Sequence, residues 1–281
     1  MAKVAIAHGS DTLLACAIAG SNKRTPWVYR NIGDPAVWGD VRGARLRVGV
    51  PLRRAAAVGA LYESARWTLV ERYRLDPGRV VTIPNAVSEF PEPTEADRTA
   101  ARVTLDLDAG LTWLAFVGAL SEEKDVCQAV RVVAADPQLG LVVAGDGTQR
   151  AEAEALAARI APGRVRFLGV SDQPLTVMAA VAALIIPSRT EGMPAVAIEA
   201  GLSGIPVVAT RVGGLPEIVL DRQTGVLVDG PPEPRRLLDA VHRAVEGRSL
   251  LGSAARQHCA AHFTMGPVAA KWAELLDRLE R

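Results

Sequence analysis

Short apolar runs rich in valine and isoleucine alternate along the chain with longer stretches of alanine, leucine, arginine and glutamate. This alternation is typical of βα units around a parallel sheet, and the continuous apolar character of the runs indicates strands buried on both faces. A pattern at residues 267–280 predicts a final amphipathic helix. The runs predict strands at residues 3–7, 27–30, 80–83, 113–117, 140–144, 165–167, 183–186, 206–209 and 225–228.

Between residues 84 and 111 the composition changes, with three prolines and a cluster of acidic residues that are more typical of a loop. The segment before it contains only three or four predicted strands, few for a doubly wound sheet, whereas the segment after it contains about six. We therefore expect an α/β fold with two Rossmann-like domains, of which the N-terminal one is incomplete. The expected parts are a partial domain at residues 1–88, a linker at 89–110, a complete domain at 111–262, and a final helix at 263–281.

The chain has 281 residues, of which 49% are hydrophobic and 22% charged, and no apolar run approaches the roughly 18 residues of a membrane span. The net charge of +1 provides no overall field that would attract nucleic acid. One local segment is basic, and leucines and valines interleave with its arginines at a spacing that is not cleanly helical. This segment fits either a solvated face or a contact with an anionic membrane surface or phosphorylated acceptor. It contains Arg42, Arg45, Arg47, Arg53 and Arg54.

Three scattered cysteines, Cys16, Cys127 and Cys259, predict neither a disulfide framework nor a metal cluster. His258 and His262 share a helical face with Cys259, but we interpret them as part of a surface helix because no fourth ligand is in view. The first apolar run is too short for the core of a signal peptide. We therefore expect a cytoplasmic protein, peripheral at the inner membrane surface if the basic segment binds lipid.

Glu191 and Glu199 stand on either side of a Gly-Met-Pro turn. Pro194 suits the first position of a helix, which predicts a helix over residues 194–202 that ends at Gly204. The free N–H groups of its first turn form a site for phosphate at the carboxyl end of the preceding strand, where ligands of open parallel sheets bind. A carboxylate at Glu199 would accept hydrogen bonds from ribose hydroxyls, although an acid near a helix N-terminus is also favourable for dipole reasons alone.

Lys124 follows Gly118 at a predicted strand-to-helix turn and is one of only four lysines in the chain. An ammonium group there would neutralise a diphosphate, and the alternative is a solvated helix start. Gly145-Asp146-Gly147 stands at another strand end, where a plain tight turn explains it equally well. Gly213-Gly214 would likewise allow a ligand to approach the backbone.

Together these residues resemble the retaining glycosyltransferases of the GT-B fold, specifically the GT4 family. The resemblance covers residues 80–262 well and 1–79 more loosely. It implies two Rossmann-like domains that face each other across a cleft, with a nucleotide-sugar donor held mainly by the second. It also implies that the helix at 263–281 crosses back to the first domain. The motifs that carry it are IPNAV at 83–87, FVGALSEEK at 116–124, VVAGDGTQR at 142–150, VRFLGV at 165–170, and PSRTEGMPAVAIEAGLSGIPVVATRVGGLPEIV at 187–219, which contains the E-x7-E signature.

The resemblance implies a role for each matching position. Glu199 would hold the donor ribose, Glu191 the transferred sugar, and Lys124 the diphosphate. The sugar would pass to a glycan, lipid or small-molecule acceptor with retention of anomeric configuration, and no metal is required. Asp106-Leu107-Asp108 imitates the metal-binding DxD motif of other glycosyltransferases, but we interpret it as a solvated turn. The remaining implied donor-binding positions are Gly118, Gly145, Gly147, Phe167, Leu168, Gly169, Gly192, Met193, Pro194, Ala195 and Val196.

The sequence departs from the family pattern in two places. Ala119 replaces the arginine that usually follows the glycine of FVG, with Arg189 as a candidate stand-in. The chain also starts at what looks like the middle of the N-terminal domain, and Arg30 and Asn31 occupy the place where many members have a histidine. His8 is then the N-terminal histidine that could approach the cleft as a catalytic residue, or else a plain residue of a strand-end turn.

Three functions follow from this reasoning. The first is an active glycosyltransferase, and the second is a truncated, non-catalytic relative that binds a nucleotide sugar or a partner chain. The third, a sugar-nucleotide epimerase, fits less well, because nothing in the sequence supplies a separate acid and base poised on the sugar.

Overall fold

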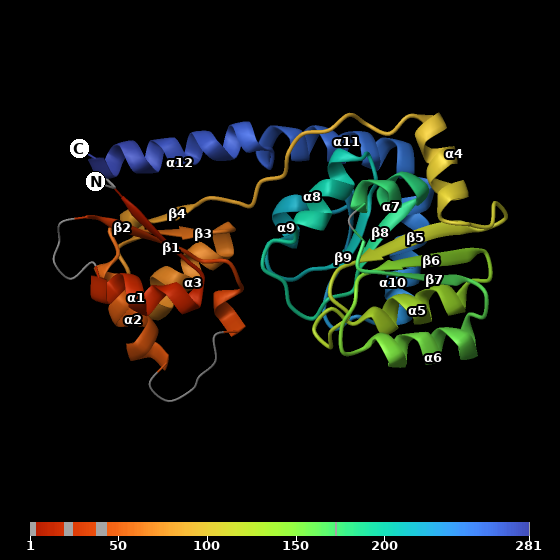
Figure 1. Ribbon diagram of the computed structural model, residues 1–281, viewed down its shortest axis with the longest axis horizontal. Coiled ribbons are helices and arrows are strands. Elements are labelled where there is room, and N and C mark those ends of the chain that lie inside the picture. Colours follow the sequence, from red (N-terminus) through yellow and green to blue (C-terminus); the bar gives the residue numbers. More distant parts are fainter. Residues whose placement is uncertain (1–3, 20–24, 38–43, 172, 281) are drawn as a thin grey trace. The chain divides into compact units, whose positions relative to one another are not determined.

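The protein consists of two units, each with one parallel sheet. A computed structural model describes residues 4–19, 25–37, 44–171 and 173–280 (Figure 1). The first unit comprises Met1–Ala86, Glu191–Met193 and Phe263–Arg281, and the second comprises Val87–Thr190 and Pro194–His262. The predicted α/β class with two parallel sheets is therefore confirmed.

The first unit is built on a four-stranded sheet in the order β1-β2-β3-β4. Parallel neighbours need crossover connections, and helices lie in each of them. Figure 1 shows α1, α2 and α3 on one face of this sheet and α12 on the other. The elements are β1 (Ala5–His8), α1 (Ser10–Ala19), β2 (Trp27–Arg30), η2 (Pro35–Val37), α2 (Ala44–Arg54), β3 (Ala57–Ala60), α3 (Glu63–Tyr73), η3 (Pro77–Arg79), β4 (Val80–Thr82) and α12 (Met265–Glu280).

Apolar residues of the sheet and of α12 form one core in the first unit. Val28 of β2 and Ala57 of β3 pack with Val268 and Leu275 of the helix. These contacts bury one face of α12, so the amphipathic helix expected at residues 267–280 is confirmed.

Strand β3 was not predicted from the sequence. Its four residues are alanine and glycine except for Val58, so it lacks the β-branched character that marked the other strands. Trp272 of α12 lies near this strand. A Cβ atom added to Gly59 would lie 3.9 Å from the indole ring.

The second unit contains a six-stranded parallel sheet in the order β10-β9-β8-β5-β6-β7. Valine, leucine, isoleucine and alanine side chains from both faces form its core. The elements are α4 (Glu95–Thr104), β5 (Thr112–Val117), α5 (Val126–Ala135), β6 (Leu139–Ala144), α6 (Arg150–Ile160), β7 (Val165–Gly169), α7 (Pro174–Ala180), β8 (Ala183–Ile186), α8 (Ala195–Leu202), β9 (Val207–Thr210), α9 (Leu215–Ile218), β10 (Gly225–Val228), α10 (Pro234–Glu246) and α11 (Arg248–His262).

The predicted strands all have counterparts. Those at residues 27–30, 183–186 and 225–228 coincide with β2, β8 and β10, and the ends of the others differ by one or two residues. Continuous apolar runs were thus a sound indicator of strands in both sheets, and β6, β8, β9 and β10 are buried along their whole length.

The predicted linker contains a helix, so its description as a loop was wrong. Thr94 and Asp97 form a capping box, in which each side chain accepts a hydrogen bond from the backbone N–H of the other residue. The helix that they start, α4, packs against α7, and Arg102 Nε donates to the carbonyl of Ala180 at 3.2 Å. After α4, Asp106 and Asp108 form the exposed turn that was predicted.

Helix α8 begins one residue later than predicted. Pro194 is its N-cap, with an extended backbone, and Ala195 is the first helical residue. Helix α11 packs closely on α8, since a Cβ added to Gly201 would lie 2.5 Å from the sulfur of Cys259. This contact fixes α8, and with it Glu199, against the rest of the second unit.

Candidate functional site

The carboxyl edge of the second sheet has a topological switch point. Strands β5 and β8 are neighbours, and the chain continues from β5 to β6 and β7 on one side but from β8 to β9 and β10 on the other. Ligands of open α/β sheets bind beyond the strand ends at such a point. The loop with Lys124 follows β5, and the loop that leads to α8 follows β8. The two loops are tied by a hydrogen bond from the backbone N–H of Arg189 to the carbonyl of Glu123 at 2.7 Å.

Glycines at the ends of β5, β6 and β7 bring neighbouring loops into backbone contact. Gly145 N–H donates to the carbonyl of Gly169 at 2.7 Å. Gly145 has a φ of +145°, and a Cβ atom there would overlap the carbonyl oxygen of Gly118. At Gly147, with a φ of +158°, a Cβ atom would lie 2.5 Å from the carbonyl oxygen of Leu120. Glycine is therefore required at positions 145 and 147 by the packing between neighbouring loops alone.

Strand β7 carries the motif that was expected to face the nucleobase. Phe167, Leu168 and Gly169 are half-buried, and the ring of Phe167 packs against the core. β7 stands at one end of the strand order, where backbone groups on the outer side of a sheet are available to a ligand. Recognition of a base by backbone groups at this strand stays a prediction.

The β5–α5 loop sets the position of Lys124. The backbone N–H groups of Lys124 and Asp125 both donate to the carbonyl of Ser121 at 3.1 Å. The Lys124 side chain is 24% exposed, and its ammonium lies 3.9 Å from the Glu123 carboxylate. A contact of this length contributes little to stability.

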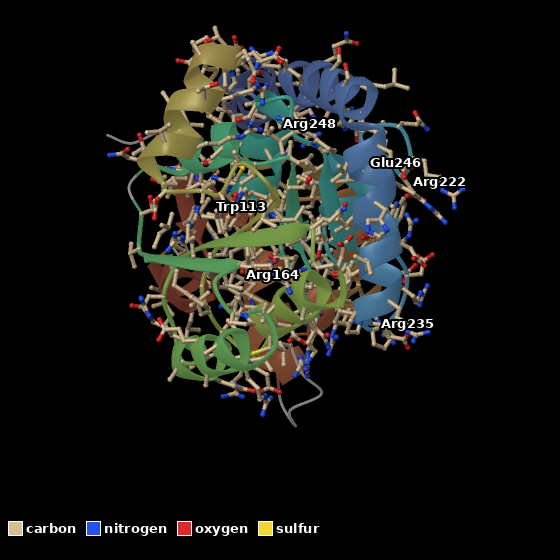
Figure 2. All side chains as sticks on the ribbon, turned by 90° about the vertical axis from the view of Figure 1, so that its right-hand side faces the viewer. Trp113, Arg164, Arg222, Arg235, Glu246 and Arg248 are labelled. Carbon is tan, nitrogen blue, oxygen red and sulfur yellow. The ribbon has the colours of Figure 1, made fainter. Side chains whose placement is uncertain are left out.

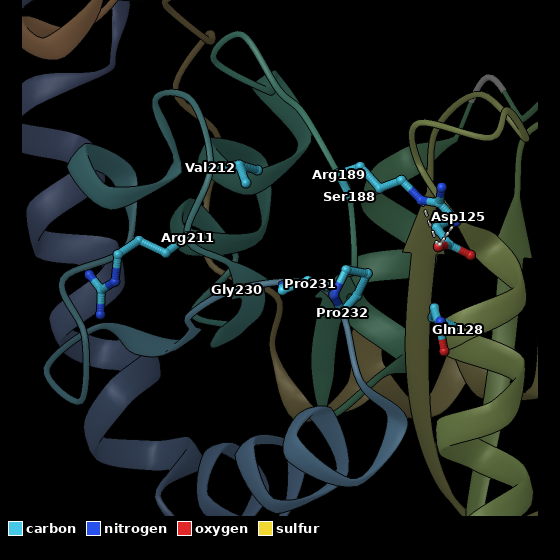
Figure 3. A pocket seen from close by; sticks show the side chains of 9 residues that line it. All are labelled: Asp125, Gln128, Ser188, Arg189, Arg211, Val212, Gly230, Pro231 and Pro232. Carbon is cyan, nitrogen blue, oxygen red and sulfur yellow. Dashed lines mark hydrogen bonds and ion pairs between the residues drawn. The ribbon is translucent and has the colours of Figure 1, made fainter.

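Arg189 forms an ion pair that joins the two central loops (Figure 3). Its Nε and Nη2 atoms donate to Asp125 Oδ2 at 3.2 and 3.1 Å, and Nη1 lies 3.5 Å from Glu122 Oε1. The Asp125 side chain is 5% exposed, so the guanidinium compensates a buried carboxylate. Arg189 is thus engaged by acidic residues, which weakens its role as a stand-in for the arginine that Ala119 replaces.

Glu199 lies on α8, in the second turn after Pro194. Burial raises the pKa of its carboxyl above the ordinary value of 4.5, because a buried site disfavours the charged form. Pro194, Ala195 and Val196 precede it at the start of the helix, where backbone N–H groups carry partial positive charge. Helix α8 therefore combines a half-buried carboxyl group with an N-terminus whose binding of an anion stays a prediction.

Glu191, Gly192 and Met193 belong to the first unit. Asn85, in the IPNAV motif after β4, donates from Nδ2 to the carbonyl of Met193 at 2.7 Å. A Cβ on Gly192 would lie 2.9 Å from the carbonyl oxygen of Ile32, so this position also requires close backbone approach. Glu191 itself is buried.

His8 ends β1, also in the first unit, and its side chain is exposed. The hydroxyl of Thr12 donates to the His8 carbonyl at 3.0 Å, and a turn through Gly9, with a φ of +77°, follows. The structure thus shows His8 at a strand-end turn, and a catalytic role for its side chain stays a prediction.

A cavity of about 610 Å³ opens at the carboxyl edge of the second unit (Figure 3). Ser188 and Arg189 of the signature segment line it, together with Asp125 and Arg211. Both arginines are paired with acids, Arg211 with Asp229 at 2.5 Å. None of the implied donor-binding residues lines this cavity, so it is distinct from the predicted donor site.

The basic segment lies partly on α2. Arg42 is outside the described residues, as is the side chain of Arg45. Arg47 and Arg54 are exposed, and Arg53 Nη1 donates to the carbonyl of Tyr73 at 3.0 Å. Residues 44–54 of this segment form a helix although the spacing of its apolar residues is not cleanly helical, and its contact with an anionic surface stays a prediction. In the part of the chain that the structure describes, no helix has the length and apolar character needed to cross a bilayer.

The three residues on α11 do not form a ligand cluster. Cys259 is buried against α8, and burial raises the pKa of its thiol to about 12. His258 Nε2 lies 2.7 Å from the carbonyl of Glu217. The helix is therefore less exposed than expected, since one side of it belongs to the core.

Comparison with known proteins agrees with this arrangement of motifs. The family model described as "Glycosyl transferases group 1" matches residues 97–260, more than half of the chain. The chain belongs to the glycosyl transferases group 1 family. The matched range includes α8 and the loops that follow β5 and β8, so the family pattern covers the switch point of the second sheet.

Curated relatives of this group 1 chain are longer than it is. D-inositol 3-phosphate glycosyltransferase from Corynebacterium diphtheriae is 34% identical over 230 residues, which is 75% of this chain and 52% of the relative. The 2-deoxystreptamine glucosyltransferase from Streptomyces kanamyceticus is 33% identical over 69% of this chain and 52% of its own length. The chain thus spans about half the length of the curated relatives it matches.

Solved structures share the fold. HepE from Anabaena in complex with UDP superposes with a TM-score of 0.88 at 22% identity, over 98% of this chain and 79% of that one. Its complex with UDP-glucose gives a TM-score of 0.87 at 24% identity, with the same shares covered. These matches confirm the GT-B fold of the group 1 chain.

Two residues of the group 1 chain had no role in the sequence-based expectations and acquire one from the structure. Asp125 anchors Arg189, and Asn85 holds Met193. Asp125 follows Lys124 directly and has a φ of +51°, a backbone conformation that aspartate tolerates better than most residues. The sequence signal for Asn85 was its place as the single polar side chain within IPNAV.

Proposed function

We propose that this chain transfers a sugar from a nucleotide-diphosphate sugar to an acceptor, with retention of configuration at the anomeric carbon. The observation that carries the proposal is the switch point of the second sheet, where the loop with Lys124 and the loop leading to α8 meet through the Arg189–Glu123 hydrogen bond. The UDP and UDP-glucose complexes of HepE support a uridine nucleotide as the donor.

The charge or polarity of each group suggests its proposed role. The diphosphate lies near Lys124 and the N–H groups at the start of α8, and Glu199 accepts hydrogen bonds from the ribose hydroxyls. Glu191 holds the transferred sugar. This scheme uses an ammonium group and a helix end for the diphosphate and does not require a metal ion.

The proposed reaction takes place on one face of the sugar. The bond between the anomeric carbon and the β-phosphate oxygen breaks, and the acceptor oxygen forms its bond on the same face. The acceptor proton passes to an oxygen of the leaving diphosphate. Negative charge grows on that diphosphate as the bond breaks, so a cation at Lys124 lowers the barrier.

Release of free nucleoside diphosphate from UDP-, GDP- and ADP-sugars, with and without candidate acceptors, tests the proposal. We expect Lys124→Ala to lower the turnover rate by about 10²- to 10³-fold and Glu191→Ala to lower it strongly. Lys271→Ala, which removes an exposed lysine of α12, is the matched control and should leave the rate unchanged. Turnover that is equal in wild type and Lys124→Ala would contradict the assignment.

A second function is a nucleotide-sugar binding protein without turnover. Engagement of Arg189 by Asp125 and Glu122 favours it, because Arg189 then does not replace the arginine that Ala119 lacks. This alternative predicts donor binding that Glu199→Gln weakens, with no nucleoside diphosphate released from any donor of the panel.

A further inference from the structure

A separate cavity of about 650 Å³ lies in the first unit, between the end of the sheet and α12. Its polar end is formed by Arg30, the last residue of β2, and by Asn85. Along its length it is lined by apolar residues of α12, including Val268, Ala269, Trp272 and Leu276. None of the residues proposed for transfer lines it, so a ligand here is independent of the proposed function.

The guanidinium group of Arg30 is half-buried and faces no acid. Its Nη2 donates to Asn85 Oδ1 at 3.0 Å, and its Cζ atom lies 5.7 Å from the centroid of the Trp272 ring. Among the described residues, Nε of Arg30 is buried without a hydrogen-bond partner, and no carboxylate forms an ion pair with it. Burial lowers the pKa of Arg30, but arginine keeps its charge at neutral pH.

Burial removes water from the Arg30 guanidinium, and no acidic side chain among the described residues forms an ion pair with it. Binding of an anion beside it would therefore be favourable. A guanidinium presents paired N–H donors that match a carboxylate or phosphate, and such charge-assisted hydrogen bonds are about twice as strong as neutral ones. In this cavity Asn85 is a neutral acceptor and Trp272 a ring face, so the charge of Arg30 is solvated only in part.

The rest of the cavity is apolar. Val268, Trp272 and Leu276 follow one another at intervals of four residues, so they lie along one face of α12. A volume of about 650 Å³ is within the range of small-molecule sites. Charge at one end and an apolar wall beyond it are the features that select an amphipathic ligand.

We propose that this cavity binds a small amphipathic anion, a carboxylate or phosphate monoester on an aliphatic or aromatic body. The anionic group accepts hydrogen bonds from Arg30, and the apolar body lies along α12 against Trp272. Asn85 also lines this cavity, and its Nδ2 donates to the carbonyl of Met193 at 2.7 Å.

Isothermal titration of the full chain with decanoate, decyl phosphate, decanol and inorganic phosphate tests the proposal. We expect both amphipathic anions to bind, and decanol and inorganic phosphate each to bind at least about tenfold more weakly, since each lacks one half of the interaction. Decanoate binding should also change the fluorescence of Trp272, a change that Trp272→Phe removes. Absence of decanoate binding, or equal binding of decanol, would overturn the proposal.

The variant Arg30→Met should lower the affinity for decanoate by about tenfold or more. Arg66→Met is the matched control, because Arg66 also lies over a tryptophan, 4.6 Å from the Trp67 ring, but forms an ion pair with Glu63 at 2.8 Å. The control should bind decanoate like wild type. Unchanged affinity in a folded Arg30→Met variant would contradict the proposal. If Arg30→Met does not fold, the affinity of Arg30→Lys for decanoate and the preference of wild type for decanoate over decanol test it instead.

Discussion

The two edges of the second sheet are built differently. At the amino edge, side chains bond to the backbone of the same unit. Arg164 Nη1 donates to the carbonyls of Val133, Asp136 and Leu139 at 2.6, 2.8 and 2.9 Å, and Trp113 Nε1 donates to the carbonyl of Asp108 at 2.8 Å. Figure 2 shows Trp113 and Arg164 in the view toward this unit.

At the carboxyl edge the loops contact each other through glycine backbone. Gly118, Gly145 and Gly169 meet there, and the backbone N–H groups of Lys124 and Asp125 donate to the carbonyl of Ser121 within the β5–α5 loop. The comparison indicates two ways of stabilising one sheet. Side chains bonded to backbone carbonyls stabilise the amino edge, whereas close backbone packing at glycines, with the Arg189–Asp125 ion pair, stabilises the carboxyl edge.

The largest effect should come from Gly145→Ala. The new Cβ would overlap the carbonyl oxygen of Gly118 at a φ of +145°, so we expect the free energy of unfolding to fall by about 3 kcal/mol or more. Gly163→Ala is the control, because Gly163 also has a positive φ, +74°, but a Cβ there meets nothing within 4 Å. That substitution should cost about 1 kcal/mol. Urea denaturation measures both, and equal costs would show that the loops are not tightly packed.

Arg164→Met should destabilise the fold by about 2 to 3 kcal/mol, because three carbonyl oxygens lose a charged donor. If the amino edge has only a structural role, this variant keeps the nucleoside-diphosphate affinity of wild type in its folded fraction. Lys124→Ala should show the reverse, with unchanged unfolding free energy and weakened binding. Thermal unfolding and titration calorimetry on both variants test the comparison, which fails if Arg164→Met also weakens binding.

A smaller effect is expected for Trp113→Phe. The substitution removes the hydrogen bond to the Asp108 carbonyl but keeps a ring over Gly140, where a Cβ would lie 2.6 Å from the indole. We expect a loss of about 1 kcal/mol in the free energy of unfolding. A loss above about 3 kcal/mol would mean that packing of the indole ring stabilises this edge more than its hydrogen bond does.

The smallest effects are those of pH, and they have opposite signs at the two edges. Near the amino edge, the backbone N–H of Gln138 and then the side chain of His242 lower the pKa of Asp136 below 3.8. Its contribution to stability is therefore present above pH 3.8 and lost as pH falls through the folded-state pKa. Asp136→Asn should reduce this loss in acid.

At the carboxyl edge, burial raises the pKa of Glu199 above 4.5. The folded state then holds this proton more tightly than the unfolded state. The contribution of the Glu199 carboxyl to the free energy of unfolding is therefore greatest below pH 4.5, and it is lost as pH rises through the folded-state pKa. Compared with Glu199→Gln, wild type should become less stable as pH rises above 4.5, and denaturation curves at several pH values would show it. A difference that stays constant with pH would contradict the buried state of this carboxyl.

The strands were predictable because burial on both faces leaves a continuous apolar run, as in β8 and β10. Strand β3 and helix α4 were not predicted for opposite reasons. Strand β3 has no local signal, because alanine and glycine surround its single valine. Helix α4 has a local signal, the capping box of Thr94 and Asp97, that the neighbouring prolines obscured.

The position of the candidate site was predictable to the level of motifs and strand ends. The sequence located Lys124 and Glu199 in the segments that follow β5 and β8. The sequence did not reveal the ion pair between Arg189 and Asp125. It also did not reveal that Gly118 leaves no room for a side chain at position 145. Both features depend on contacts between loops that are distant in the chain. Ligand roles for these residues stay predictions.

Hydrogen exchange with and without the nucleoside diphosphate that binds most tightly is the most direct test of the carboxyl edge as the donor site. The account predicts slower exchange on ligand addition in peptides that contain residues 118–124 and 194–199. Peptides at the amino edge, around residues 108–113 and 136–139, should not change. Slower exchange at the amino edge alone, or no change at residues 118–124 under saturating ligand, would contradict the account.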